Sequence, residues 1–382
     1  MSARARAAIA GIGATVFSKD SGRSELRLAA EAVRAALADA GLTPADVDGL
    51  VTFTMDTSPE ITVAQACGMG ELSFFSRVHY GGGAACATVG QAAMAVATGA
   101  AEVVVCYRAF NERSGRRFGS GVRHREPTAE GAALGWVMPA GLLTPASWVA
   151  MAARRYLHVH GLTPEAFGPV AVTARRHAAV NPAAHFHGRP ITLADHAASR
   201  WIAEPLRLLD CCQETDGGQA LVVTTLDRAR GLPRPPAVIA AAAQGAGRAQ
   251  EQMTGFHRGD LTGLPEAEAV ARRLWATTGL GPQDIDVGIL YDHFTPFVLM
   301  QLEAYGFCGP GDAAAFVAEE RLPLNTHGGQ LGEAYLHGMN GIAEAVRQLR
   351  GTSVNQVAGA ERVLVTAGTG VPTSGLVLTA DT

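Results

Sequence analysis

Two stretches of the chain share one pattern of apolar and polar positions. An alanine-rich helical periodicity covers Glu25–Ala40 and returns at Pro265–Thr278. Each predicted helix stops at a glycine, and a short acidic turn and an aliphatic run follow it, ending at the aromatic residue Phe53 or Tyr291. The recurrence of this helix, turn and strand so far along the chain indicates an internal duplication.

Both copies continue in the same way. In the first, a glycine turn at residues 81–83 opens an apolar helix to about Thr98, before the strand Glu102–Tyr107. In the second, a glycine-rich run from Gly328 opens a helix to about Leu349, before the strand Glu361–Thr366. Strands that alternate with helices in two similar halves predict a layered α/β fold.

The duplication divides the chain into four parts. Residues 1–110 form an N-terminal half, 111–205 an inserted loop domain, 206–235 the return and connection, and 236–382 a C-terminal half. The start of the chain admits two readings, because the apolar run Ala8–Gly13 fits either a buried first strand, which we favour, or a signal peptide. The charge-free segment Gly131–Ala153 is nominally long enough to span a bilayer. Prolines and glycines interrupt it, so we interpret it as an apolar cover over a site.

Composition narrows the function. The 382 residues carry a formal net charge of -4, which gives no general electrostatic attraction to phosphate backbones or anionic membranes. We therefore expect neither nucleic acid nor a membrane as a partner. Lys19, the only lysine, lies in a polar loop pattern, which excludes Schiff-base chemistry and a phosphate-binding Gly-Lys-Thr loop. The six cysteines form no C-x-x-C pair, so we expect no metal site and a reducing cytoplasm.

Three places carry candidate chemistry. Cys86 stands where a glycine turn meets a helix, a position that favours a thiolate or an oxyanion, although a small buried residue fits there equally well. Tyr291-Asp-His-Phe ends a buried strand, where catalytic groups often lie; alternatively the tyrosine packs in the core and Asp292 caps the next helix. The run from Gly328 to Gly341 holds a density of polar groups that is hard to bury without purpose.

These three motifs, with the run extended back to Asn325, resemble those of thiolases of the sterol-carrier-protein, or lipid-transfer-protein, branch. The resemblance implies duplicated βαβαβαββ halves that form a five-layered αβαβα sandwich with an inserted loop domain. The sequence departs from that branch at its proton-handling positions. Where that branch has His-Asp-Cys-Phe at the strand end, this chain has Tyr291 at the first position. Tyr335 replaces the histidine of the branch's Gly-His-Pro-Leu-Gly motif. The run Thr366–Val371 lacks the Cys or His that related enzymes place before a glycine run.

That pattern is similar to the lipid-transfer-protein aldolases of bacterial steroid degradation, which cleave a tertiary β-hydroxyacyl-CoA to a ketone and propionyl-CoA. The resemblance implies catalytic roles for Tyr291, Tyr335, His293 and His337, the nucleophile or oxyanion position for Cys86 and Gly370, and substrate binding by Asn325, Gly328, Gly329 and Trp148. Coenzyme A enters as part of the substrate and no other cofactor is expected. Which tyrosine is the base stays open. Two alternatives also stay open, a thiolase that uses Cys86 and a non-catalytic acyl-CoA or lipid-binding subunit.

The resemblance also predicts partners. We expect a homodimer with the strand Glu102–Tyr107 at its twofold interface. The related aldolases require an accessory domain with an OB-fold and a zinc ribbon from a hydratase subunit. A separate subunit of that kind would complete a heterotetramer.

Overall fold

One mixed sheet runs through the computed structural model, which describes residues 6–115, 132, 135–250, 256 and 258–381. Its strands lie in the order β3-β2-β4-β7-β1-β8-β11-β10-β9. They comprise β1 (Ala7–Ala14), β2 (Gly49–Phe53), β3 (Phe74–Val78), β4 (Val103–Asn111), β7 (Asp216–Thr225), β8 (Ala237–Gly245), β9 (Val287–Ile289), β10 (Arg362–Thr366) and β11 (Thr373–Ala380). The first five in that order belong to the N-terminal half and the other four to the C-terminal half.

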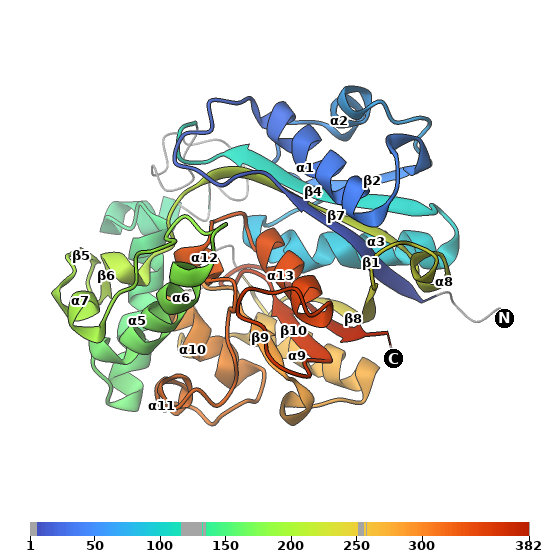
Figure 1. The fold of residues 1–382 in the computed structure, drawn as a ribbon. Helices are drawn as coiled ribbons and strands as arrows, with labels where there is room; N and C mark the ends of the chain where they lie inside the picture. Colours follow the sequence, from blue (N-terminus) through green and yellow to red (C-terminus); the bar gives the residue numbers. More distant parts are fainter. Residues whose placement is uncertain (1–5, 116–131, 133–134, 251–255, 257, 382) are drawn as a thin grey trace.

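Helices cover the outer faces of both halves of this sheet, and further helices lie between the two halves (Figure 1). In the N-terminal half they are α1 (Glu25–Ala40), α2 (Glu60–Cys67), α3 (Ala85–Thr98) and α8 (Leu226–Arg230), and in the C-terminal half α9 (Pro265–Thr278), α10 (Thr295–Ala304), α11 (Ala313–Ala318), α12 (Gly329–Gly332) and α13 (Met339–Leu349). Helices α3 and α13 share one apolar core between the two halves of the sheet, whereas α1 and α9 pack on the outer faces. The five predicted layers and the α/β class are therefore confirmed.

The duplication is visible in the order of the elements. The first half reads β1-α1-β2-α2-β3-α3-β4-β7, which is the predicted βαβαβαββ unit. In the second half the third strand is reduced to a single bridge between Gly288 and Leu324. Gly288 donates its N–H to the carbonyl of Pro323 at 2.9 Å, but Pro323 has no N–H of its own, which limits further pairing there.

The bounds predicted for α1 and α9 are confirmed, because local signals fix their ends. The Ser24 hydroxyl accepts a hydrogen bond from the N–H of Arg27 at the start of α1. Gly41 and Gly279 end α1 and α9 in the left-handed conformation, with φ of 68° and 72°. The sequence predicts one helix from Gly328 to about Leu349, but the structure has the short helix α12 there and then α13, which begins only at Met339.

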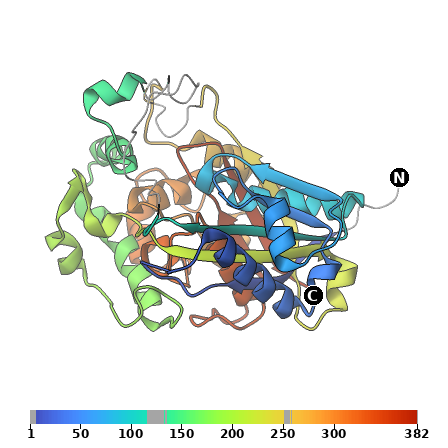
Figure 2. The same ribbon diagram turned by 90° about the horizontal axis from the view of Figure 1, so that it is seen from above.

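The inserted domain leaves the sheet after β4 and returns at β7, and these two strands are antiparallel neighbours. It contains α5 (Pro145–His160), α6 (Gly168–Val180), α7 (Leu193–Ala198) and a hairpin of β5 (Trp201–Ala203) and β6 (Leu206–Arg207). Figures 1 and 2 both place these helices at one end of the sheet, away from the chain termini. The predicted boundary at residue 205 falls inside the β5–β6 hairpin.

The expected dimer interface changes with the structure. The strand predicted at a twofold interface is β4, but β4 pairs with β2 on one side and β7 on the other, so it has no free edge. The free edge of the N-terminal half is β3, where Phe75 is 60% exposed. The prediction failed because a hydrophobic run shows burial but not the order of strands.

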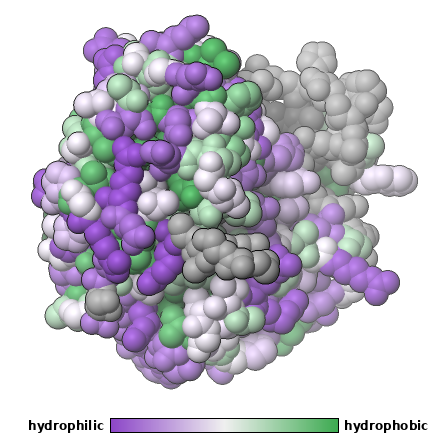
Figure 3. Space-filling view, turned by 90° about the vertical axis from the view of Figure 1, so that its right-hand side faces the viewer, coloured by the Kyte–Doolittle hydropathy of each residue, from purple (hydrophilic) through white to green (hydrophobic). Residues whose placement is uncertain are grey.

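The apolar segments at the start and middle of the chain also have defined places. Residues 7–14 form the buried strand β1, as favoured. Of Gly131–Ala153, residues 131, 133 and 134 lie outside the described part, residues 135–137 are helical, and α5 begins at Pro145. Across the described residues, no helix has both the length and the apolar character needed to cross a membrane. On the face shown in Figure 3, hydrophobic residues are scattered among hydrophilic ones.

Candidate active site

A small pocket, with room for about 40 Å³, opens where several strands end. Its walls come from the loops after β2, β3, β9 and β10 and from the loop between α12 and α13. Because β2 and β3 are parallel, as are β9 and β10, their carboxyl ends meet at this edge of the sheet, the usual place for a ligand. The described residues that line it are Met55, Tyr80, Gly81, Gly82, Gly83, Tyr291, His293, Tyr335, His337, Gly368, Thr369 and Val371.

Two phenols meet in this pocket. The hydroxyl oxygens of Tyr291 and Tyr335 are 3.3 Å apart, a distance at which one phenol donates to the other. The two side chains are 3% and 7% exposed, and their burial raises the pKa of both phenols well above the usual value. Both tyrosines are therefore neutral at physiological pH, able to donate one hydrogen bond and to accept another.

The backbone of each tyrosine is fixed by residues from elsewhere in the chain. The N–H of Tyr291 donates to Thr366 Oγ1 at 2.9 Å, and its carbonyl accepts from Gln301 Nε2 at 2.8 Å. The N–H of Tyr335 donates to Thr215 Oγ1 at 2.8 Å. A Cβ atom at Gly82 would lie 1.9 Å from the Tyr291 hydroxyl oxygen, so only glycine leaves room for the phenol.

The two histidines predicted beside the tyrosines also line the pocket. His293 packs its ring on Phe297, with centroids 5.2 Å apart, and its Nδ1 has no hydrogen-bond partner among the described residues. Burial lowers the pKa of His293 to about 3, so its imidazole is neutral. The rings of Tyr335 and His337 have centroids 4.9 Å apart. The four side chains predicted to be catalytic therefore lie around one cavity.

Behind His337 lies an ion pair that the sequence analysis did not single out. Arg108, near the end of β4, donates from Nε to His337 Nδ1 at 3.1 Å and from Nη1 to the carboxylate of Asp56. Both charged side chains are 1% exposed. The guanidinium also lies 3.7 Å from the centroid of the Phe110 ring. A single charge inside the otherwise apolar run of β4 was the signal that could have identified Arg108.

Cys86 lies outside the residues that line the pocket. It is the second residue of α3, where the sequence predicts a glycine turn to meet a helix, but Gly81–Ala84 already forms a 3-10 helix before it. Its Sγ faces the carbonyl of Val365 at 3.6 Å. Burial raises the pKa of the thiol well above its usual value, which disfavours a thiolate. Gly370 also lies outside the lining, and its N–H donates to Glu266 Oε1 at 2.9 Å.

The residues predicted to bind substrate hold the loops in place. Asn325 accepts the N–H of Leu290 at 2.8 Å, which ties the glycine-rich run to the end of β9. Gly329 lies so close to Asp292 that a Cβ there would be 1.8 Å from its Oδ2, and Gly328 approaches Ala178 in the same way. Asp292 does not cap the following helix, α10; it accepts N–H groups at the start of α12, from Gln330 and Leu331.

Trp148 lies apart from the pocket lining. It is a buried residue of α5, and its indole N–H donates to the carbonyl of Leu142 at 2.7 Å. All four substrate-binding assignments therefore stay predictions, since the structure shows only what these residues contact.

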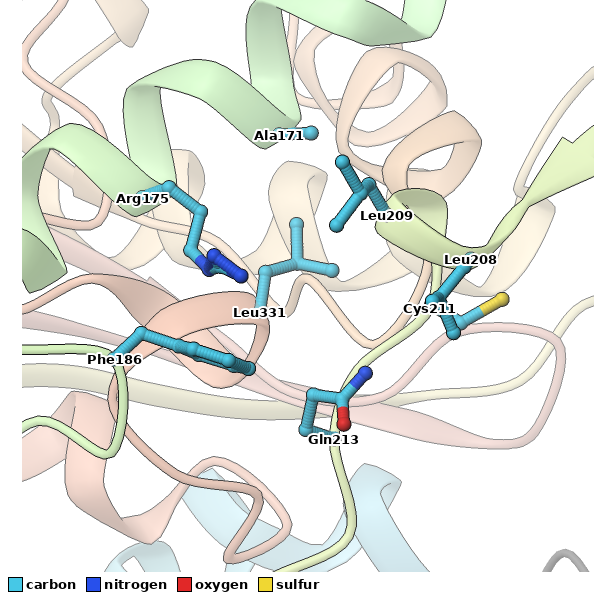
Figure 4. A pocket seen from close by; sticks show the side chains of 8 residues that line it. All are labelled: Ala171, Arg175, Phe186, Leu208, Leu209, Cys211, Gln213 and Leu331. Carbon is cyan, nitrogen blue, oxygen red and sulfur yellow. The ribbon is translucent and has the colours of Figure 1, made fainter. Parts of the chain in front are cut away.

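A second, smaller hollow, with room for about 10 Å³, lies between α6 and the segment after β6. Figure 4 shows Arg175 beside the Phe186 ring, with Gln213 and Cys211 across the hollow. The guanidinium carbon is 3.5 Å from the Phe186 ring centroid. This hollow holds neither of the two phenols, so it is separate from the candidate active site.

The fold and the site together define a thiolase-like protein in which phenols and neutral imidazoles occupy the pocket. Family models agree: that of the thiolase N-terminal domain matches residues 5–227, and that described as thiolase C-terminal domain-like matches residues 247–379. The chain therefore belongs to the thiolase family.

Two similar proteins are named as an aldolase and a lyase. The chain is 67% identical to the steroid side-chain-cleaving aldolase of Thermomonospora curvata, over 98% of both chains. It is 65% identical to the 17-hydroxy-3-oxo-4-pregnene-20-carboxyl-CoA lyase of Mycobacterium tuberculosis, over 98% of this chain and 99% of the relative. A solved structure titled Ltp2-ChsH2(DUF35) aldolase superimposes with a TM-score of 0.95 at 66% identity, over 98% of both chains.

Proposed function

We propose that the protein is a carbon–carbon lyase that cleaves a steroid-type tertiary β-hydroxyacyl-CoA to a steroid ketone and propionyl-CoA. The observation that carries the proposal is the contact of Tyr291 and Tyr335, whose hydroxyl oxygens lie 3.3 Å apart in the pocket, while Cys86 lies outside it. The names of the two relatives with about two thirds identity support the same reaction and the steroid substrate.

The reaction needs proton transfers but no covalent acyl-enzyme. The β-hydroxyl loses its proton, and the bond between the hydroxyl-bearing carbon and the α-carbon breaks. The hydroxyl oxygen becomes the ketone oxygen, and the electron pair passes into the thioester enolate. The α-carbon then takes up a proton, so atoms and charge balance without an oxidant or a cofactor.

Two neutral phenols in contact suit this balance. One tyrosine accepts the hydroxyl proton while it passes its own proton to the other, which protonates the α-carbon. Because burial raises the pKa of both phenols, a relay that never accumulates a free phenolate is favoured over a tyrosinate base. We place the reacting atoms in this pocket, which His293 and His337 also line.

The partners belong to the proposal as well. We infer a homodimer and an OB-fold, zinc-ribbon subunit, which together make a heterotetramer. The similar solved structure carries both Ltp2 and ChsH2(DUF35) in its title, which supports a second subunit. A cytoplasmic location is consistent with the six cysteines, all of which are free thiols.

One assay separates the lyase from its alternatives. The purified chain, alone and with a DUF35-type subunit, is incubated with a 17-hydroxy steroid bearing a 20-carboxyl-CoA thioester. Release of ketone and propionyl-CoA without added coenzyme A supports the lyase. Product formation that depends on free coenzyme A indicates a thiolase, and tight binding without turnover under both conditions indicates a binding subunit.

A further inference from the structure

Arg108 contacts His337 of the candidate active site, yet it does not itself line the pocket. It lies one layer behind His337 and is fixed from several sides. Asp56 accepts from Arg108 Nη1 and also accepts the N–H of Ala109 at 3.2 Å, so the carboxylate holds both the guanidinium and the strand that carries it. The ring of Phe110 lies flat against both Arg108 and His337.

The bond from Arg108 determines which nitrogen of His337 carries a proton. A guanidinium has N–H donors and no acceptor, so the Nδ1 atom that it contacts at 3.1 Å must supply a lone pair. A neutral imidazole with a lone pair on Nδ1 carries its proton on Nε2. That Nε2 atom faces the pocket wall, because it lies 3.8 Å from where a Cβ of Gly81 would stand.

The backbone of His337 shows that this orientation is imposed. Its φ is 51°, in the left-handed region that non-glycine residues adopt uncommonly, histidine, asparagine and aspartate more often than the others. The side chain is 2% exposed and stacks on Phe110 at 5.2 Å between centroids. Strain of this kind persists only where the surroundings fix the residue, and the buried pair Arg108–Asp56 is the fixing element.

We propose that Arg108 is a positioning residue that holds His337 in the tautomer with its proton on Nε2, so that this N–H donates to the thioester oxygen of the bound acyl-CoA. The inference rests on the lyase function proposed above and assigns His337 a specific part in it. A neutral N–H donor in a buried pocket stabilises charge that develops on the enolate oxygen. His337 could not then be the base, since its only lone pair is already bound to Arg108.

The tautomer can be measured directly in the unmodified protein. Protein labelled with ¹⁵N-histidine is examined by NMR, and the His337 signals are assigned by their loss in His337→Asn, a substitution that tolerates the left-handed φ. We expect Nε2 to be protonated and Nδ1 to be unprotonated across neutral pH. A proton on Nδ1 in the wild type would overturn the proposal. This measurement needs no turnover, so its failure is distinct from failure of the lyase assignment.

Two matched variants test the kinetic role. Each carries Asp56→Asn to avoid an unpaired buried carboxylate, together with Arg108→Gln or Arg108→Met. The glutamine amide nitrogen lies the same number of bonds from Cα as Arg Nε and can donate to Nδ1, whereas the methionine methyl group at that position cannot. We expect the methionine variant to lose about 10- to 1000-fold in kcat with little change in KM, and the glutamine variant to keep at least about tenfold more activity.

Tyr107→Phe serves as the control for general damage to β4. It removes a buried hydrogen bond from the neighbouring residue, to the carbonyl of Ser58 at 2.9 Å, without touching His337. Equal kcat values for the methionine, glutamine and Tyr107→Phe variants would refute the kinetic role. If the methionine variant does not fold, the tautomer of the wild type still decides the proposal.

Discussion

Replacing Tyr335 or Tyr291 by phenylalanine removes one oxygen from the pair of phenols and leaves the ring packing in place. The remaining hydroxyl loses a partner that lies 3.3 Å away, which lowers the free energy of unfolding by only about 1 kcal/mol. Loss of a proton-transfer group lowers kcat about 100- to 10,000-fold, which corresponds to about 3–5 kcal/mol in the activation barrier. Activity therefore falls far more than stability does.

Cys86→Ala gives the opposite expectation. The hydrogen-bond partner of the thiol is a backbone carbonyl at 3.6 Å, and Cys86 packs in the apolar core within the alanine-rich helix α3, so alanine keeps the fold at a loss of about 1 kcal/mol. Turnover should stay within about tenfold of the wild type. Because the relay uses both phenols as one unit, the double variant of Tyr291 and Tyr335 should be no more than slightly worse than either single one.

The assay follows release of ketone and propionyl-CoA without free coenzyme A, and thermal unfolding is recorded for every variant. A stable Cys86→Ala protein that has lost turnover, together with active phenylalanine variants, would refute the lyase mechanism and favour acyl transfer. If the fold-loss of kcat in the double variant equals the product of the two single losses, the two tyrosines act independently and the relay is refuted.

Three shorter predictions concern the surroundings of the site. Gly82→Ala should lower kcat at least about tenfold, because its methyl group would lie 1.9 Å from the Tyr291 hydroxyl. Gly70→Ala, whose methyl group would stand in open space, is the control that should keep the wild-type kcat. Equal kcat values for the two variants would contradict this prediction. Burial raises the pKa of Glu112 to about 8, so the folded protein binds a proton that the unfolded chain releases near pH 4.5. Relative to Glu112→Gln, its free energy of unfolding should therefore fall by about 1.4 kcal/mol per pH unit up to about pH 8 and then level off; denaturant titrations showing a constant difference would exclude this. Phe75→Glu places a charge on the exposed edge of β3 and should shift a homodimer toward monomer in sedimentation, whereas an unchanged dimer mass would place the interface elsewhere.

The parts of the fold that the sequence predicted well are those with local signals. The bounds of α1 and α9 follow from a serine cap and left-handed glycines, which act within a few residues of the helix ends. Strand order is not local, and for this reason β4 was predicted at an interface although it lies inside the sheet. Cys86 lies at the start of α3, as predicted, but the sequence alone does not show that it stays outside the pocket lining.

In the candidate active site, too, local signals were predicted from the sequence and contacts between distant residues were not. Tyr291 and Tyr335 were found because each replaces a residue at a motif position, but their contact joins residues 44 positions apart and no spacing rule predicts it. Arg108 joins Asp56 and His337 across 52 and 229 positions, and none of the three stands in a motif with the others. A charge in a buried strand nevertheless requires a partner, because an unpaired buried guanidinium would cost several kcal/mol. An isolated charge in an apolar strand therefore predicts a carboxylate in a loop at the same edge of the sheet. Asp56, three residues after the end of β2, is that carboxylate.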